Sequence, residues 1–323
     1  MTVLLPTNDS NGSGNSEDTI FTDQNRTGAE DEYDHSAMAM LLGNITFSFI
    51  LIISLLGLWG NGVVIKILGF RIKRTPYTIY ILNLSGADFG VLICLICLTI
   101  GKFVDTLDER HSVLPWFVNI IVQLFFFTYS TSQFLLAAIS IDRCVAVLFP
   151  LWHRYHRPPH LSPIACALIW ILSFLLPGIN ITLLVTGILL VPPLLFQVIV
   201  NVLLSAPLMV ISTLTLFINV NCKAKRAHRG KLVTAILLAL LFFLLFAFPL
   251  NVFYIIRWPF FNLIPIGLVC ASLNSSINPL IYFLVGKRQR KSPARVSIKV
   301  ALQRVFEDEQ ECEEESTRCE TSV

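Results

Sequence analysis

The sequence predicts an all-α membrane protein, a bundle of seven transmembrane helices. Composition is the first indication, because the 323 residues are 54% hydrophobic and only 14% charged, with a mean hydropathy of +0.70. A soluble domain carries about 25% charged residues. The second indication is seven apolar runs, since a helix needs about 20 apolar residues to cross the hydrocarbon core. Lipid offers the backbone no hydrogen bonds, so each run must be helical.

The third indication is the distribution of basic residues. Of the 24 Lys and Arg residues, 20 fall on the side of the C-terminus, and only Arg26, Lys102, Arg110 and Arg257 fall on the side of the N-terminus. Loops rich in Lys and Arg stay in the cytoplasm because they resist translocation. We therefore expect a multi-pass protein of the plasma membrane with its N-terminus outside the cell.

Glycosylation sequons agree with this orientation. Five Asn-x-Ser/Thr sequons map to the predicted exterior and are predicted glycosylation sites: Asn8, Asn11, Asn25, Asn44 and Asn180. Two more, at Asn83 and Asn274, lie inside apolar runs and are interpreted as chance matches.

The chain divides into three predicted regions. Residues 1–42 form an acidic tail that is expected to be disordered, because it has too little apolar surface to offset the entropy of ordering. No signal peptide is visible in the tail, so the first span must itself direct insertion. The transmembrane domain covers residues 43–285, and residues 286–323 are predicted to form an amphipathic helix on the membrane surface followed by an acidic tail.

The seven spans are predicted in order along the chain. Their ranges are 43–69, 77–101, 113–148, 161–182, 193–219, 231–256 and 263–285. The third is longer than one crossing needs and should tilt or protrude, and Pro150 ends it. Residues 158–222 contain no Asp, Glu, Lys or Arg, but paired prolines and Pro177-Gly178 interrupt them, which predicts a turn at 183–192. This turn is so apolar that it either lies on the membrane surface or covers the bundle as a lid.

Cysteine and lysine positions exclude some structures and functions. None of the eight cysteines falls in a predicted extracellular loop, so no extracellular disulfide is expected. Cys94-x-x-Cys97 is interpreted as two packing residues of one membrane helix. A retinal protein needs a lysine in its last span, and 263–285 has none. A seven-span transporter with Asp88 as the coupling carboxylate, and a scaffold that acts through its tail, remain open alternatives.

One polar or proline motif occurs in each span, in a recognisable order. The motifs are Gly60-Asn61, Asn83-Leu84-Ser85-Gly86-Ala87-Asp88, Asp142-Arg143-Cys144, Trp170, Pro207, Phe246-Ala247-Phe248-Pro249 and Asn278-Pro279-Leu280-Ile281-Tyr282. Together they closely resemble the rhodopsin class of G-protein-coupled receptors. The stretches 143–158 and 273–286 narrow the resemblance to the Mas-related receptors, near the Mas-like branch, over residues 43 to 310.

The resemblance implies a receptor that senses an extracellular ligand and activates heterotrimeric G proteins, with arrestin and receptor kinases as further partners. It implies no enzymatic activity and no nucleic-acid partner. The residues implied in G-protein coupling and activation are Asp142, Arg143, Cys144, Pro249, Asn278, Pro279 and Tyr282. Asp142 is expected to hold Arg143 as a neighbouring ion pair. A sodium-binding cluster is implied at Asp88, Asn61, Ser132, Asn274 and Asn278.

The ligand side is less well defined by the sequence. Polar and aromatic residues near the outer ends of the spans are candidate pocket residues: Lys102, Asp105, Asn119, Gln123, Tyr254, Arg257, Trp258 and Asn262. Trp116 is interpreted instead as a membrane-interface residue. The acidic exterior favours a cationic peptide ligand, whereas the apolar turn at 183–192 favours a hydrophobic one. Phe125 stands where aminergic receptors have an Asp, which argues against a monoamine.

Two features of the cytoplasmic side bear on signalling. Arg229 stands where many relatives have an acid that restrains the third-span arginine, so ligand-independent signalling is expected. Basic residues at 287–291 favour contact with anionic membrane lipid. The C-terminal Thr321-Ser322-Val323 has the pattern that PDZ domains bind by strand addition.

Overall fold

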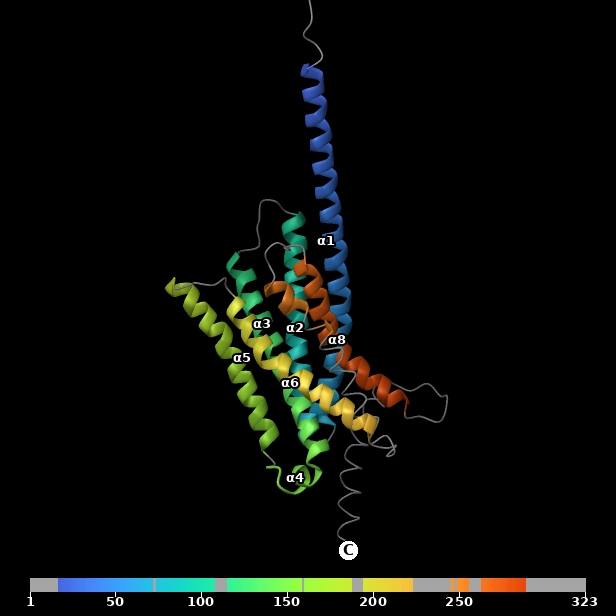
Figure 1. Ribbon diagram of the computed structural model, residues 1–323, viewed down its shortest axis with the longest axis vertical. Coiled ribbons are helices and arrows are strands. Elements are labelled where there is room, and N and C mark those ends of the chain that lie inside the picture. Colours follow the sequence, from blue (N-terminus) through green and yellow to red (C-terminus); the bar gives the residue numbers. More distant parts are fainter. Residues whose placement is uncertain are drawn as a thin grey trace, which may run out of the picture. The chain divides into compact units, whose positions relative to one another are not determined.

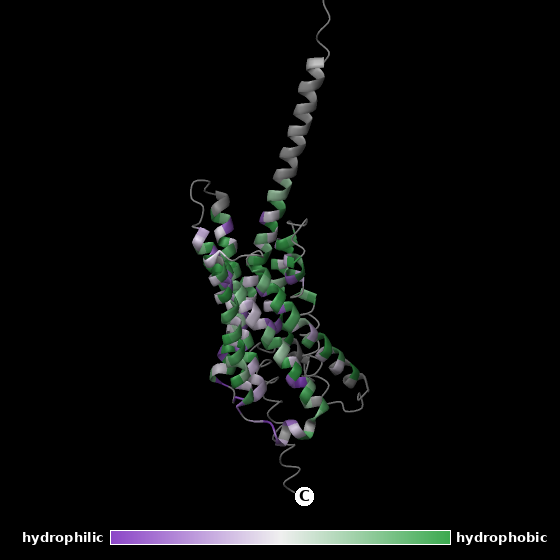
Figure 2. Cartoon of the chain, turned by 60° about the vertical axis from the view of Figure 1, so that its left-hand side comes forward, coloured by the Kyte–Doolittle hydropathy of each residue, from purple (hydrophilic) through white to green (hydrophobic). Residues whose placement is uncertain are grey.

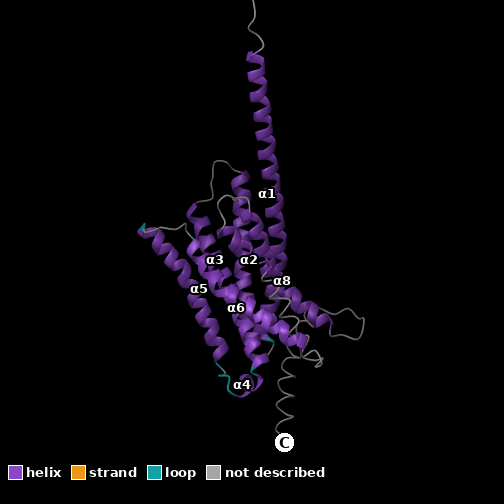
Figure 3. Cartoon of the chain, viewed as in Figure 1, coloured by secondary structure: helices purple, strands orange, loops and turns teal. Residues whose placement is uncertain are grey.

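The computed structural model describes part of the chain, which is helical and contains no strand (Figure 3). The described residues are 17–71, 74–107, 115–158, 160–187, 194–222, 245–246, 249–255 and 263–288. Contacts divide the chain into two compact units, Met1–Ile45 and Thr46–Val323.

The described part of the first unit belongs to helix α1, Glu17–Phe70. The sequence predicts disorder for the acidic tail, and this prediction is wrong from Glu17 onward, where the backbone is helical. Proline is absent from residues 17–45, so nothing in that stretch breaks the helix.

The second unit is a bundle of membrane-spanning helices. Six helices of the described part are long and apolar enough to cross a membrane. They are α1, α2 (Pro76–Leu107), α3 (Pro115–Leu148), α5 (Leu161–Thr186), α6 (Leu195–Cys222) and α8 (Ile264–Arg288). Hydrophobic residues dominate the coloured, membrane-spanning parts of the helices in Figure 2. Six of the seven predicted spans are thereby confirmed. The remaining one, predicted at 231–256, is described only at residues 245–246 and 249–255, which are helical.

Helix α3 is the central element of the bundle (Figure 1). It packs against α2, α4, α5 and α6, and α2 also packs against α5 and α8. The most apolar part of α3 is 78% buried, against 28% for α5. Its 34 residues span about 50 Å at 1.5 Å per residue, longer than the hydrocarbon core. The expected protrusion of the third span is consistent with this length.

A short helix follows α3 that the sequence reading did not predict. Helix α3 ends at Leu148, and Pro150 begins α4, Pro150–Tyr155, in the loop between α3 and α5. Proline favours the first position of a helix because its fixed φ suits the helix and no N–H is needed there. Pro150 therefore separates two helices and does not simply end one.

Two apolar clusters fill the bundle, and a polar layer lies between them along the chain. One cluster includes Leu84 of α2 and Leu135 of α3, and the other includes Val91 of α2 and Tyr129 of α3. Buried polar residues of four helices lie between these two clusters. We call them the polar layer: Asn61, Asp88, Ser132, Asn274, Ser275 and Asn278, all buried.

Candidate functional site

Asp88 is the centre of the polar layer and has no solvent exposure. The hydroxyl of Ser132 donates to Asp88 Oδ1 at 2.7 Å, and Nδ2 of Asn278 donates to Asp88 Oδ2 at 2.8 Å. Three helices, α2, α3 and α8, therefore meet at one carboxylate. Burying an ionised carboxylate is costly unless donors or a cation compensate it, and these two bonds supply part of that compensation.

The asparagines of the layer differ in what they contact. Asn61 donates to the carbonyls of Gly57 and Ser275, at 3.0 and 2.9 Å, and so ties α1 to α8. Among the described residues, Asn61 Oδ1 and Asn274 Nδ2 are buried without a hydrogen-bond partner. The structure thus joins Asp88, Ser132 and Asn278 directly and places Asn61 and Asn274 in the same layer without a bond to the carboxylate.

These buried oxygens suit a small hard cation. Carboxylate, hydroxyl and amide oxygens are the ligands that such cations prefer. The described residues contain no group of three or more His, Cys, Asp or Glu side chains, so a transition-metal centre is not supported there. The donor set fits the sodium-binding cluster that the sequence reading expected.

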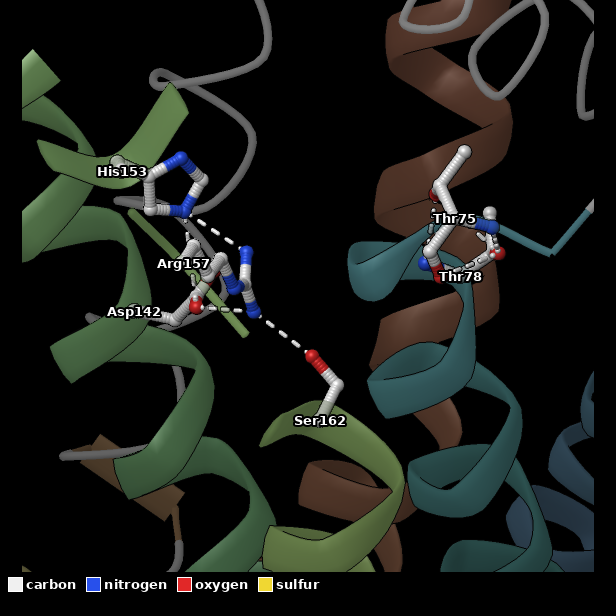
Figure 4. A network of polar contacts seen from close by, with 6 residues as sticks. All are labelled: Thr75, Thr78, Asp142, His153, Arg157 and Ser162. Carbon is white, nitrogen blue, oxygen red and sulfur yellow. Dashed lines mark hydrogen bonds and ion pairs between the residues drawn. The ribbon is translucent and has the colours of Figure 1, made fainter. Parts of the chain in front are cut away.

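The second polar group lies at the α4 end of α3 (Figure 4). Asp142 Oδ1 lies 2.7 Å from Nη2 of Arg157, and both side chains are more than nine-tenths buried. The same Nη2 donates to the hydroxyl of Ser162 at 2.7 Å, and Nη1 lies 2.8 Å from Nε2 of His153. Because guanidinium can only donate, His153 Nε2 accepts this bond. We call Asp142, His153, Arg157 and Ser162 the loop network.

Arg143 takes a different position from the one expected. Its guanidinium lies over the ring of Tyr77, 3.9 Å from the ring centroid, which is cation–π geometry. The short ion pair of Asp142 is with Arg157, at 2.7 Å, and not with its neighbour Arg143, although the charge of Arg143 also acts favourably on this carboxylate. Adjacent helical residues point in different directions, so sequence adjacency does not favour their pairing.

Tyr77 is positioned by a reciprocal cap at the start of α2. The backbone N–H of Thr78 donates to Thr75 Oγ1 at 3.2 Å, and the N–H of Thr75 donates to Thr78 Oγ1 at 2.8 Å. Figure 4 shows the two threonines facing each other. This is a capping box with threonine in place of glutamate, and it satisfies two N–H groups that the helix itself leaves unpaired. The cap fixes the helical turn that carries Tyr77.

The remaining predicted activation residues lie on three helices. Cys144 donates its thiol to the carbonyl of Ser212 on α6 at 3.1 Å. Tyr282 and Pro279 are buried in α8, where Pro279 lies inside the helix. Pro249 is partly buried at the start of the described stretch 249–255. Arg229 lies outside the described residues.

The predicted pocket residues divide into buried, exposed and undescribed positions. Gln123 is buried and accepts a bond from Nδ2 of Asn180 at 3.4 Å. Tyr254 is partly buried and meets Phe126 edge to face at 5.7 Å. Lys102, Asn119 and Trp116 are exposed. The side chain of Asp105, and all of Arg257, Trp258 and Asn262, lie outside the described part, as does most of the apolar turn.

The position of Asn180 argues against its predicted glycosylation. It lies inside α5 rather than in a loop, is 5% exposed, and accepts the N–H of Leu194 at 3.2 Å in addition to its bond to Gln123. A glycan on Nδ2 would place a sugar inside the bundle, on the nitrogen that contacts Gln123. Asn44 is partly exposed on α1, and the side chains of Asn8, Asn11 and Asn25 are not described.

The sequence reading missed a polar stripe between α3 and α6. Gln197 Nε2 donates to Ser130 Oγ at 3.0 Å and to the carbonyl of Phe126 at 3.0 Å, and Asn201 Nδ2 donates to Ser130 Oγ at 2.8 Å. The available signal was spacing, since Gln197, Asn201 and Ser205 recur every fourth residue in an otherwise apolar run. All three side chains are buried.

Comparisons with known proteins match most of the chain. The model of the 7 transmembrane receptor (rhodopsin family) matches residues 60–282. The mouse protein named Proto-oncogene Mas (Mus musculus) is 36% identical over 276 residues, which cover 80% of this chain and 83% of that protein. Mas-related G-protein coupled receptor member H of Rattus norvegicus is 39% identical over 279 residues, covering 81% and 83%. Member D of Homo sapiens is 35% identical over 279 residues, covering 80% and 84%.

Proposed function

The chain belongs to the rhodopsin family of G-protein-coupled receptors, in its Mas-related branch, and from this membership we propose that it activates heterotrimeric G proteins when an extracellular ligand binds. The receptor stands in the plasma membrane with its N-terminus outside, the orientation that the sorting of Lys and Arg supports. It has no catalytic activity of its own. The observation that carries the coupling role is Arg143, set beside the loop network and over the Tyr77 ring at the α4 end of α3.

Activation in this proposal is a movement of the sixth span about Pro249. A proline inside a helix removes one backbone hydrogen bond and makes a bend that can act as a hinge. Outward movement of that span opens a cleft at the cytoplasmic ends of the helices, where Arg143 meets the G protein. Pro279, Asn278 and Tyr282 provide a second bend in α8 next to Asp88. Exposed apolar residues of the α3–α5 loop, Leu151 at 73% and Trp152 at 45%, offer further contact surface.

A G-protein activation panel in cells tests the proposal. The receptor is expressed with each G-protein subtype, with and without a library of cationic peptides, since the acidic tail would raise the local concentration of a cation. We expect at least one subtype to respond and to show activity without ligand, because Arg229 is a cation and cannot restrain Arg143. Basal activity no higher than that of an empty-vector control, at matched surface expression, would contradict the expected ligand-independent signalling. Silence across all subtypes and peptides would contradict the coupling.

A sodium ion bound at the polar layer is the second part of the proposal. Support comes from the buried carboxylate of Asp88 and the buried amide oxygen of Asn61 that has no hydrogen-bond partner among the described residues. When bound, the ion supplies a positive charge beside the carboxylate. Ser132 and Asn278 orient that carboxylate from α3 and α8.

Replacing Asp88 with asparagine is expected to remove the effect of sodium on basal signalling. Exchange of choline for sodium at constant ionic strength should raise basal activity of the unaltered receptor about twofold or more, the shift expected when a site is at least half filled. Asp88→Asn should show no such change. Thr99→Val is the matched control, since Thr99 is a buried polar residue of the same helix outside the layer. Equal sodium sensitivity in Asp88→Asn would exclude this site.

Several partners and modifications are proposed from the sequence, because most of their residues lie outside the described part. Hydroxyls beside acidic residues at 311–323 suit receptor kinases and arrestin, and Thr321-Ser322-Val323 suits a PDZ protein. The segment 286–306 would lie on anionic membrane lipid. Asn8, Asn11, Asn25 and Asn44 remain proposed glycosylation sites.

A further inference from the structure

We propose that Arg157 positions Arg143 by occupying Asp142, so that Arg157, in the loop after α4, sets how readily Arg143 is available to a G protein. This inference rests on the proposed function for its signalling readout. It starts from the arrangement of the two arginines. Asp142 Oδ1 lies 2.7 Å from Arg157 Nη2, while the guanidinium of Arg143 lies 3.9 Å from the centroid of the Tyr77 ring. Arg143 and Arg157 are alternative cations for one buried acid.

Arg157 is anchored strongly enough to hold this acid. Ser162 accepts from its Nη2 at 2.7 Å and His153 accepts from its Nη1 at 2.8 Å, so two side chains besides Asp142 fix the guanidinium. The Arg157 side chain is 7% exposed, which limits competition by water. Charge-assisted hydrogen bonds in such surroundings are roughly twice as strong as neutral ones.

Asp142 needs a cation, and the chain offers a second one close by. Its side chain is 8% exposed, and among the described residues its second oxygen, Oδ2, is buried without a hydrogen-bond partner. Loss of Arg157 would remove the 2.7 Å ion pair and leave the buried carboxylate with His153 Nε2 at 3.8 Å and the charge of Arg143 beside it, which is unfavourable. The neighbouring residue, Arg143, would then be drawn from the Tyr77 ring towards the acid. An arginine held by an adjacent carboxylate is less available to a partner protein.

The signalling test compares Arg157→Met with three other variants at matched surface expression. Basal nucleotide exchange should fall about tenfold in Arg157→Met, the change that one charge-assisted hydrogen bond supports. The double variant Asp142→Asn/Arg157→Met should recover exchange, because no acid remains to hold Arg143 and no buried charge is left unpaired. Ser162→Ala, which removes one anchor of Arg157 but keeps the ion pair, should lower exchange less than Arg157→Met does. Arg74→Met, which removes an exposed arginine just before the α2 cap, should change exchange less than twofold, the span of about 0.4 kcal/mol expected for surface changes.

A second measurement does not depend on any G protein. Thermal unfolding of the purified full chain gives the coupling between Tyr77→Leu and Arg143→Ala in a double-mutant cycle. We expect coupling in the unaltered background and its loss in the Arg157→Met background. If Arg143→Ala abolishes exchange while Arg157→Met leaves both exchange and the coupling unchanged, or if Arg157→Met raises exchange, the inference is wrong. If no variant changes exchange but the Tyr77–Arg143 coupling energy still depends on Arg157, the proposed activation of G proteins is wrong. The inference that Arg157 positions Arg143 then stands.

Discussion

Replacing Arg143 with alanine is expected to abolish nucleotide exchange on G proteins while leaving the receptor at the cell surface. Arg143 lies at the end of α3, and its guanidinium rests on the Tyr77 ring rather than in the ion pair of the loop network. A cation–π contact on a buried ring such as Tyr77 contributes about 2 kcal/mol, a loss that folding should survive. The lost contacts to a G protein are charge-assisted, and exchange should fall at least about tenfold.

This variant also separates the receptor from the transporter that the sequence alone left open. Flux through a transporter would depend on Asp88 and would tolerate Arg143→Ala. Arg74→Ala is the matched control, because Arg74 is an exposed arginine immediately before the α2 cap. Full exchange by Arg143→Ala at equal surface expression would refute the role given to Arg143. Loss of exchange in both variants would show that the effect is not specific to this position.

Replacing Gly57 with alanine is expected to reduce the amount of folded receptor sharply. Helices α1 and α8 approach closely here, and a Cβ on Gly57 would clash with Ser276 Oγ and lie 2.7 Å from Ser276 Cβ. Ser276 Oγ also donates to the carbonyl of Ile53 at 3.2 Å, so the side chain cannot turn away without losing this bond. Overpacking of this kind costs about 1–3 kcal/mol. Thermal unfolding of the purified receptor and surface labelling of cells both report the loss.

Gly86→Ala is the matched control for this prediction. A Cβ on Gly86, in α2, would meet no atom within 4 Å, and alanine favours a helix over glycine by about 1 kcal/mol. Its apparent Tm should stay level or rise. The double variant Gly57→Ala/Ser276→Gly should recover part of the loss, because it moves the extra carbon from one helix to the other. A Gly57→Ala receptor as stable as Gly86→Ala would show that the two helices can separate at little cost.

Most residues of the polar layer could be predicted from the sequence, but their hydrogen-bond partners could not. Asp88, Ser132 and Asn278 were predicted to cluster, and they are joined by bonds of 2.7 and 2.8 Å. Charged and amide groups are so unfavourable in an apolar span that each one is conspicuous in the sequence. Asn61 and Asn274 were placed in the right layer, but their own partners, a backbone carbonyl among them, could not be predicted from residue type. Ser275 was missed because serine is common in membrane helices.

The sequence by itself determined the order and approximate position of the six spans that the structure describes, because the thickness of the bilayer requires a length of apolar chain that can be counted locally. Only the tertiary structure decided which groups pair. Asp142 binds Arg157, fifteen residues along the chain, and not its neighbour Arg143, because the loop after α4 returns Arg157 to the end of α3. Asn180 is buried because its amide turns into the bundle, where it contacts Gln123 and the backbone of Leu194. Apolar length is a property of one segment, whereas the choice of an ion partner depends on where several segments meet in space.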